Sequence, residues 1–313
     1  MRKTIAAALT ALIALGSASA FADVPDSCKT VRFSDVGWTD ITATTAVTTL
    51  ILQDIGYKTD TKILSVPVTY QSMKNNDIDV FLGNWMPTMK SNIEPLKKAG
   101  DVDVVRANLT GAKYTLATNA AGAKLGIKSF SDVAKHADAL DDKVYGIEPG
   151  NDGNALIIKM INDDKFDLGK FHLVESSEQG MLSQVKRASN ADKPIVFLGW
   201  EPHPMNTNYD LTYLSGGDDV FGPNYGGATV YTNTRAGYVS KCANVGTLLK
   251  NLQFSLKMEN QIMGSILDDN MDGQKAAQAW LKKNPSVLDE WLKGVTTVDG
   301  KPALPAVKKA LGV

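Results

Sequence analysis

The sequence predicts two α/β lobes, each built on a mostly parallel sheet with helices on both faces. Short β runs alternate with helical stretches, and this order is typical of parallel strands joined by crossover helices. The alternation restarts near residue 144, which indicates a second lobe. A chain of 313 residues with 43% hydrophobic and 21% charged residues also suits a globular protein of two domains.

The first lobe begins with a β run and a helix rich in Thr and Ala. We expect strands at 30–36, 61–66, 80–82 and 102–106, and helices at 41–55, 69–76 and 89–98. Gly56 directly follows the first helix, as expected at a helix C-terminus.

The second lobe repeats the pattern. We expect strands at 144–147, 171–174 and 195–198, and helices at 154–162 and 180–189. Segments 114–117 and 229–231 are β-like and lie where the chain would leave and re-enter the first lobe. The tail 243–292 carries apolar residues at helical spacing. These features place the first part of lobe 1 at 23–112, lobe 2 at 113–229, and the second part of lobe 1, with its C-terminal helices, at 230–313.

The N-terminus is typical of an export signal. Arg2 and Lys3 precede an apolar run at 4–16, and small residues at 17–22 offer a cleavage site after Ala22. The apolar run is too short to span a membrane, which needs about 20 residues. We therefore expect residues 1–22 to be a signal peptide and the mature chain to be soluble and periplasmic.

Charge and cysteine content further limit the possible partners and the state of the thiols. Loss of Arg2 and Lys3 shifts the formal charge from -1 to -3, which argues against a nucleic-acid partner. Cys28 and Cys242 are the only cysteines, and in an oxidising compartment they predict one disulfide, with two free buried thiols as the alternative. A bridge would bring both ends of the chain into one lobe.

Three of the five tryptophans follow a β run. Trp38 ends VRFSDVGW, Trp85 ends DVFLGNW and Trp200 ends PIVFLGW. Each has a Gly one or two residues earlier, which is expected to let the backbone turn sharply and approach a ligand closely. Ligands of open α/β sheets bind outside the carboxyl ends of the strands, so these rings should face one cleft. Trp280 and Trp291 lie in C-terminal helices and are expected to pack there. For any one ring, core packing is the competing interpretation.

Aromatic ring faces in a water-filled cleft are suited to binding a cationic ligand whose charge is spread over methyl groups. A quaternary ammonium has no N–H to donate, so hydrogen bonds and carboxylates do not grip it well, whereas electron-rich ring faces do. Asp35, Asp40, Glu148, Asp152 and Glu201 lie in or beside the same loops, opposed by Lys113 and His203. The cleft should therefore prefer a net cation.

The motifs VGWTD, FLGNWMP, AKYTLA, EPGNDGNA and FLGWEPHPMN resemble those of the periplasmic choline-binding proteins of bacterial ABC importers, relatives of the glycine betaine and proline betaine receptors. This resemblance covers the whole mature chain and implies the two-lobed periplasmic binding protein fold. It implies an aromatic box formed by four residues: Trp38, Trp85, Tyr114 and Trp200. It also implies that Asp40 and Asn151 bind the choline hydroxyl, and that Cys28 pairs with Cys242.

The resemblance also implies partners. The receptor would close around choline and deliver it to a membrane permease and ATPase, and we expect a monomer without cofactor or metal. Choline's hydroxyl can donate to Asp40 and accept from the Asn151 amide. Acetylcholine lacks that donor and should bind more weakly, while the carboxylate of glycine betaine would be repelled by Asp40. Asn151 has a competing role as the N-cap of the following helix.

Other classes remain open at this point. An enzyme has little support, because the three histidines lie in unrelated contexts and no G-x-S-x-G, zinc spacing or phosphate loop is present. We therefore expect no catalytic activity. A receptor for glycine betaine or carnitine is the alternative within the binding class. A sensory receptor for the same quaternary amines would use the same closed form, so the sequence does not separate it from a transport receptor.

Overall fold

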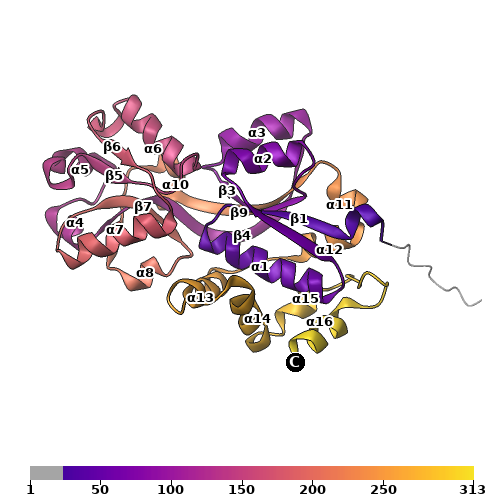
Figure 1. Cartoon of the computed structure of the whole chain (residues 1–313). Coiled ribbons are helices and arrows are strands. Elements are labelled where there is room, and N and C mark those ends of the chain that lie inside the picture. Colours follow the sequence, from indigo (N-terminus) through magenta and orange to yellow (C-terminus); the bar gives the residue numbers. More distant parts are fainter. Residues whose placement is uncertain (1–23) are drawn as a thin grey trace, which may run out of the picture.

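The computed structural model describes residues 24–313 and shows two lobes connected by two long strands (Figure 1). The export signal predicted at 1–22 lies outside the described residues. Within 24–313, no helix is both long enough and apolar enough to cross a membrane.

Lobe 1 opens with the expected alternation of strands and helices. Its first elements are β1 (Thr30–Asp35), α1 (Thr39–Asp54), β2 (Lys58–Ile63), α2 (Val66–Lys74), β3 (Val80–Met86) and α3 (Lys90–Ala99). Strands β2, β1 and β3 are parallel neighbours in that order. Helices α2 and α3 lie on one side of these strands and α1 on the other (Figure 1).

Helix α1 is buried on nearly every side, which explains its composition. Small and β-branched residues fill it, and the hydroxyls of Thr48 and Thr49 donate back to the carbonyls of Thr44 and Thr45 at 2.8 Å. Two of the buried hydroxyls of this helix are thus satisfied by its own backbone.

The second strand was predicted at 61–66, three residues too late. Ser65 is the N-cap of α2 and Pro67 lies in its first turn, so the chain is already helical at Val66. Strand β2 is an edge strand with a mostly exposed surface, so it lacks the alternation of buried and exposed residues that would have marked its position.

Lobe 2 contains the second set of expected elements. Its strands are β5 (Lys143–Tyr145), β6 (His172–Val174), β7 (Val196–Glu201) and β8 (Leu211–Tyr213). Its helices are α4 (Ala120–Leu125), α5 (Phe130–Val133), α6 (Asp152–Asn162), α7 (Glu178–Asn190), α8 (Met205–Asn208), α9 (Asp218–Phe221) and α10 (Pro223–Gly226). Strand β5 pairs in parallel with both β6 and β7, as the fold class requires.

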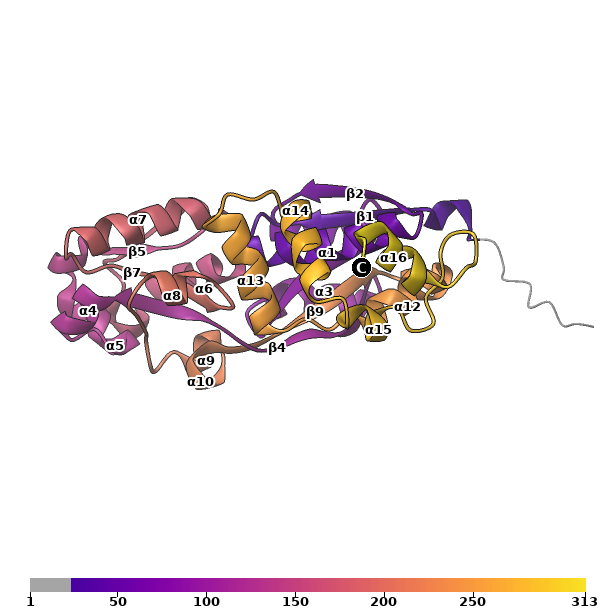
Figure 2. The ribbon, with the colours of Figure 1, turned by 90° about the horizontal axis from the view of Figure 1, so that it is seen from below.

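Two long strands carry the chain between the lobes. Strand β4 (Val102–Asn119) is one continuous strand of 18 residues, although the sequence predicted a strand at 102–106 and a separate β segment at 114–117. It pairs antiparallel with β9 (Gly227–Arg235) and further on with β7. The two predicted sheets are thereby joined into one, in the order β2-β1-β3-β9-β4-β7-β5-β6. Figure 2 shows β4 and β9 running side by side along the molecule. The predicted lobe boundaries at 113 and 229 fall inside these two strands.

The C-terminal segment returns to lobe 1 and covers α1. It comprises α11 (Tyr238–Lys241), α12 (Ala243–Asn251), α13 (Leu256–Leu267), α14 (Gly273–Lys283), α15 (Val287–Trp291) and α16 (Ala303–Leu311). Helices α13, α14 and α16 pack on α1. The predicted disulfide is confirmed: Cys28 and Cys242 are bonded, with their Cα atoms 5.4 Å apart. Trp291 is buried and Trp280 partly buried in this segment, away from the cleft.

Candidate functional site

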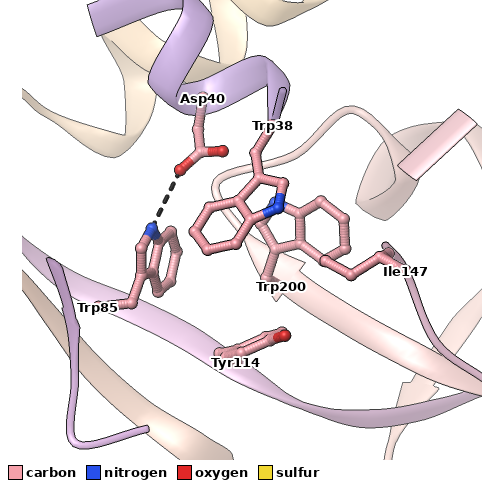
Figure 3. A pocket seen from close by; sticks show the side chains of 6 residues that line it. All are labelled: Trp38, Asp40, Trp85, Tyr114, Ile147 and Trp200. Carbon is pink, nitrogen blue, oxygen red and sulfur yellow. Dashed lines mark hydrogen bonds between the residues drawn. The ribbon is translucent and has the colours of Figure 1, made fainter. Parts of the chain in front are cut away.

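Four aromatic side chains surround one pocket between the lobes. The pocket is lined by six residues: Trp38, Asp40, Trp85, Tyr114, Ile147 and Trp200. Figure 3 shows these six side chains arranged around a common space. Each of the four rings is at most 5% exposed, so a guest held between them would be almost fully removed from water.

The topology explains why the three tryptophans meet. Trp38 is the N-cap residue of α1 and follows β1, whereas Trp85 lies near the carboxyl end of β3. Because β1 and β3 are parallel, both rings reach the same edge of lobe 1. Trp200 lies near the carboxyl end of β7, which is parallel to β5, and it occupies the facing edge of lobe 2.

Tyr114 reaches the pocket through strand pairing. It lies in β4 directly opposite Trp200 of β7, in antiparallel register. Its ring centroid is 6.3 Å from that of Trp200, at an interplanar angle of 86°, and 5.9 Å from that of Trp85, at 61°. These edge-to-face contacts fix three walls of the box at an angle to one another.

The polar tips of the rings are held by partners, which orients the ring faces. The indole N–H of Trp85 donates to Asp40 Oδ2 at 3.1 Å, and that of Trp38 donates to Glu148 Oε1 at 2.9 Å. The Tyr114 hydroxyl donates to Asn151 Oδ1 at 2.9 Å. With these donors occupied, the surfaces offered to a guest are π faces, which attract cations.

Asp40 supplies the carboxyl group of the pocket wall. It is 1% exposed, and its Oδ1 has no hydrogen-bond partner within 24–313. Burial, helped by the nearby charge of Glu178 and opposed by the Trp85 hydrogen bond, raises the pKa of this carboxyl to about 8. An ammonium placed in the box would relieve this penalty by supplying the missing countercharge.

Other carboxyls make the surroundings of the pocket acidic. Burial raises the pKa of Glu148 to about 7 and that of Asp152 to about 6. Glu201 differs, because it lies at the end of β7 and forms a partly exposed ion pair with Lys113 of β4 at 3.3 Å. The predicted preference for a cation therefore depends on Asp40, Glu148 and Asp152 and not on Glu201.

A family model described as the substrate-binding domain of an ABC-type glycine betaine transport system, OpuAC, matches residues 29–283. The chain belongs to this family. The match spans both lobes and includes every residue that lines the pocket.

Two solved structures extend the comparison. An ABC-transporter choline-binding protein in complex with choline is 68% identical to this OpuAC-family chain, with a TM-score of 0.91 over 92% of this chain and 100% of the other. The unliganded semi-closed form of an ABC-transporter choline-binding protein matches with the same identity and coverage and a TM-score of 0.85. The structure of the present chain is thus more similar overall to the choline complex.

A curated relative carries the other ligand class of the family. The glycine betaine/carnitine transport binding protein GbuC of Listeria monocytogenes is 29% identical over 157 residues, which are 50% of this chain and 51% of GbuC. The resemblance to choline-binding proteins and to betaine receptors, predicted from the motifs, is confirmed by these matches.

Asn151 is the one predicted ligand residue of this chain that does not line the pocket; the other five do. It is buried but is not among the residues that line the pocket. It is the N-cap of α6, where its Oδ1 accepts from the Asn154 N–H at 2.9 Å as well as from Tyr114. It therefore holds the Tyr114 ring by its hydroxyl, and its predicted contact with a ligand hydroxyl stays a prediction.

The glycines before the tryptophans serve two purposes. Gly37 has φ +82° and makes the turn between β1 and α1 that presents Trp38. A Cβ on Gly83 would lie 2.8 Å from the Ile41 side chain, and one on Gly199 would lie 3.0 Å from Ala117 Cβ. Close packing inside the strands explains these two, so the sharp turn predicted for all three glycines is wrong for Gly83 and Gly199.

Two residues of the site region were missed from the sequence. Ile147 follows β5 and lines the pocket, and the rule that selected the tryptophans would have found it. Glu178 lies behind the pocket wall, where its charge acts on Asp40. No local motif marks it, because its partners are far away in the chain. Among residues 24–313, no group of three or more His, Cys, Asp or Glu side chains is arranged to hold a metal ion.

Proposed function

We propose that this protein is the periplasmic receptor of an ABC importer for choline. The single observation that carries the proposal is the box itself: four aromatic faces around one shared space, with a single buried and incompletely paired carboxyl group in its wall. This combination suits a methylated cation that also carries a hydroxyl. The close match to a protein solved with choline supports the same ligand.

The expected affinity agrees with the size of the ligand. Choline has seven non-hydrogen atoms, for which the ceiling of about 1.5 kcal/mol per atom allows roughly 10 kcal/mol. Four desolvated cation–π contacts of about 2 kcal/mol each supply most of the gross attraction before the cost of closing the lobes. Micromolar binding needs only about 8 kcal/mol.

The geometry of the pocket supports the following site assignment. Trp38, Trp85, Tyr114 and Trp200 surround the trimethylammonium group, Asp40 accepts from the hydroxyl, and Asn151 supports Tyr114 or reaches the hydroxyl after small shifts. The lobes, divided near 113 and 229, close by movement about β4 and β9. The protein acts as an exported monomer that hands choline to a permease and ATPase, and it catalyses no reaction on choline.

A receptor for glycine betaine or carnitine is the second candidate, favoured by the family model and by GbuC. Asp40 decides between the two, because a betaine carboxylate would meet a carboxylate in a site with few donors. We expect choline to bind most tightly, acetylcholine more weakly because it lacks the hydroxyl donor, and the two zwitterions least.

Isothermal titration calorimetry with choline, acetylcholine, glycine betaine and carnitine tests this order on one preparation. Tighter binding of glycine betaine than of choline would overturn the choice of ligand and the role given to Asp40.

A further inference from the structure

The side chain of Glu178 joins the two lobes behind the pocket. Glu178 begins α7 in lobe 2, and its side chain is fully buried. Its Oε2 accepts from the backbone N–H of Thr39 at 2.8 Å, and its Oε1 accepts from the Thr39 hydroxyl at 2.7 Å. Thr39 begins α1 in lobe 1, 139 residues earlier in the chain. One carboxylate therefore holds the first residue of a helix in the opposite lobe.

Helix α1 lacks a cap of its own. The N-cap residue is Trp38, which supplies no side-chain hydrogen bond to the helix because its ring lines the pocket. The first N–H groups of a helix need acceptors, and the positive end of the helix dipole favours an anion. Glu178 supplies both from lobe 2, and it can do so only while the lobes are together.

His203 ties the same carboxylate to the wall of lobe 2. His203 Nδ1 accepts from the Met205 N–H at 2.9 Å, so the ring proton is on Nε2, which donates to Glu178 Oε1 at 2.9 Å. The His203 ring also packs edge-on against Trp200, with centroids 4.8 Å apart. Glu178 thus accepts three hydrogen bonds, and a buried carboxylate needs such donors to offset the loss of water.

Thr39 stands between two residues of the pocket. Trp38 and Asp40 are its neighbours in sequence, and both line the cavity. Any displacement of the first turn of α1 therefore moves one ring and the carboxylate of the box together. The contacts run from Trp200 through His203 and Glu178 to Thr39, which connects a wall of lobe 2 to the walls of lobe 1.

We propose that Glu178 is a positioning residue for ligand binding: it clasps the N-terminus of α1 when the lobes close and so sets Trp38 and Asp40 against the guest. The assignment rests on the proposed function, since it concerns how the same pocket is assembled. Glu178 does not touch the guest. Its contribution is to the stability of the closed form and therefore to the rate at which the guest leaves.

Glu178→Gln tests the clasp because the amide keeps the shape but replaces one acceptor oxygen by an NH₂ group. Three donors then face one remaining acceptor atom. The matched control is Glu290→Gln, an exposed residue at the surface of α15. Two measurements are needed: hydrogen exchange at the Thr39 amide by NMR, with and without choline, and the affinity and dissociation rate of choline.

We expect Glu178→Gln to speed exchange at Thr39 and to weaken choline binding about tenfold or more, chiefly through faster dissociation. Glu290→Gln should match the wild type in both. Thr39→Val, which keeps the N–H but loses the hydroxyl, should weaken binding less, and adding it to Glu178→Gln should cost little more. If Glu178→Gln does not fold, Thr39→Val by itself still tests the clasp.

Two results would overturn the clasp. One is unchanged Thr39 exchange in Glu178→Gln, and the other is altered exchange with unchanged choline affinity and dissociation. Failure of the proposed function looks different, because wild-type protein would then not bind choline while the exchange comparison between Glu178→Gln and Glu290→Gln still reports on the clasp.

Discussion

Asp40→Asn is the substitution that most directly tests how the pocket selects its ligand. Asn is a near-isostere of the protonated acid, and burial raises the pKa of Asp40 to about 8, so the carboxyl is mainly neutral at pH 7. The Asn side chain can keep an oxygen toward the Trp85 indole N–H, which donates to Asp40 at 3.1 Å. We therefore expect the fold and the thermal stability at pH 7 to change little.

The effect on choline follows from two opposing terms. A cation about 4 Å from the ionised carboxyl gains roughly 4 kcal/mol at an effective dielectric constant of about 20. Ionising Asp40 at pH 7 costs about 1.4 kcal/mol, because its pKa of about 8 lies one unit higher. The difference of about 2–3 kcal/mol predicts that Asp40→Asn binds choline roughly 30- to 150-fold more weakly.

Glycine betaine should respond in the opposite sense. Its carboxylate is repelled by the ionised acid, so Asp40→Asn should leave betaine affinity unchanged or improve it. The assay is calorimetry of wild type and Asp40→Asn with both ligands at pH 7 and pH 9, with the melting temperature as a control for folding. The loss for choline should be larger at pH 9, where no ionisation cost remains. A choline-to-betaine affinity ratio that is the same in both proteins would refute this account of the pocket.

The remaining predictions concern the box, its titration and the disulfide. Trp200→Ala should weaken choline binding at least tenfold with an unchanged circular dichroism spectrum, and an unaltered dissociation constant would mean that this ring only packs. In the wild type, choline affinity should rise from pH 6 to about 8 and then level off. Burial raises the pKa of Asp40 to about 8, and a bound cation lowers it again. Choline binding below pH 8 therefore releases a proton. Calorimetry in buffers of different ionisation enthalpy detects that proton, and a slope as steep in Asp40→Asn would assign it to another group. Replacing Cys28 and Cys242 together by Ser should lower the free energy of unfolding by about 5 kcal/mol for a sequence separation of 214 residues, as measured by urea denaturation. This double variant should keep its choline affinity, because Cys28 precedes β1 whereas the pocket lies beyond the carboxyl end of that strand. A large loss of binding would contradict the view that the disulfide stabilises the fold without shaping the pocket.

Much of the site was predictable because it depends on strand ends. Trp38, Trp85 and Trp200 follow or end β runs, and parallel strands bring their carboxyl ends to one edge, so their convergence required no knowledge of distant contacts. Tyr114 was different. Its place in the box comes from the antiparallel register with Trp200, and the residues alone indicated only a packed strand residue; the resemblance to choline-binding proteins was needed to select it.

Other features of the site depend on contacts that no local pattern encodes. Gly83 and Gly199 are small because Ile41 and Ala117 approach them, and these neighbours are visible only in the folded chain. The N-cap role of Asn151 was expected from the sequence, but the hydrogen bond from Tyr114 to its amide oxygen was not, and its contact with the ligand stays a prediction. Glu178 lies 139 residues from Thr39, and nothing near it in the sequence indicates a clasp.

The sequence by itself determined the fold class of the protein and the kind of ligand that we propose for it, because the period of apolar residues sets strands and helices and the residue types at strand ends set what a cleft can hold. The tertiary structure alone decided how the walls stand relative to one another. Strand register, burial and the closing of two lobes are set by many weak contacts between residues far apart in the chain, and those contacts turn three separate tryptophans, one tyrosine and a desolvated carboxylate into a single pocket.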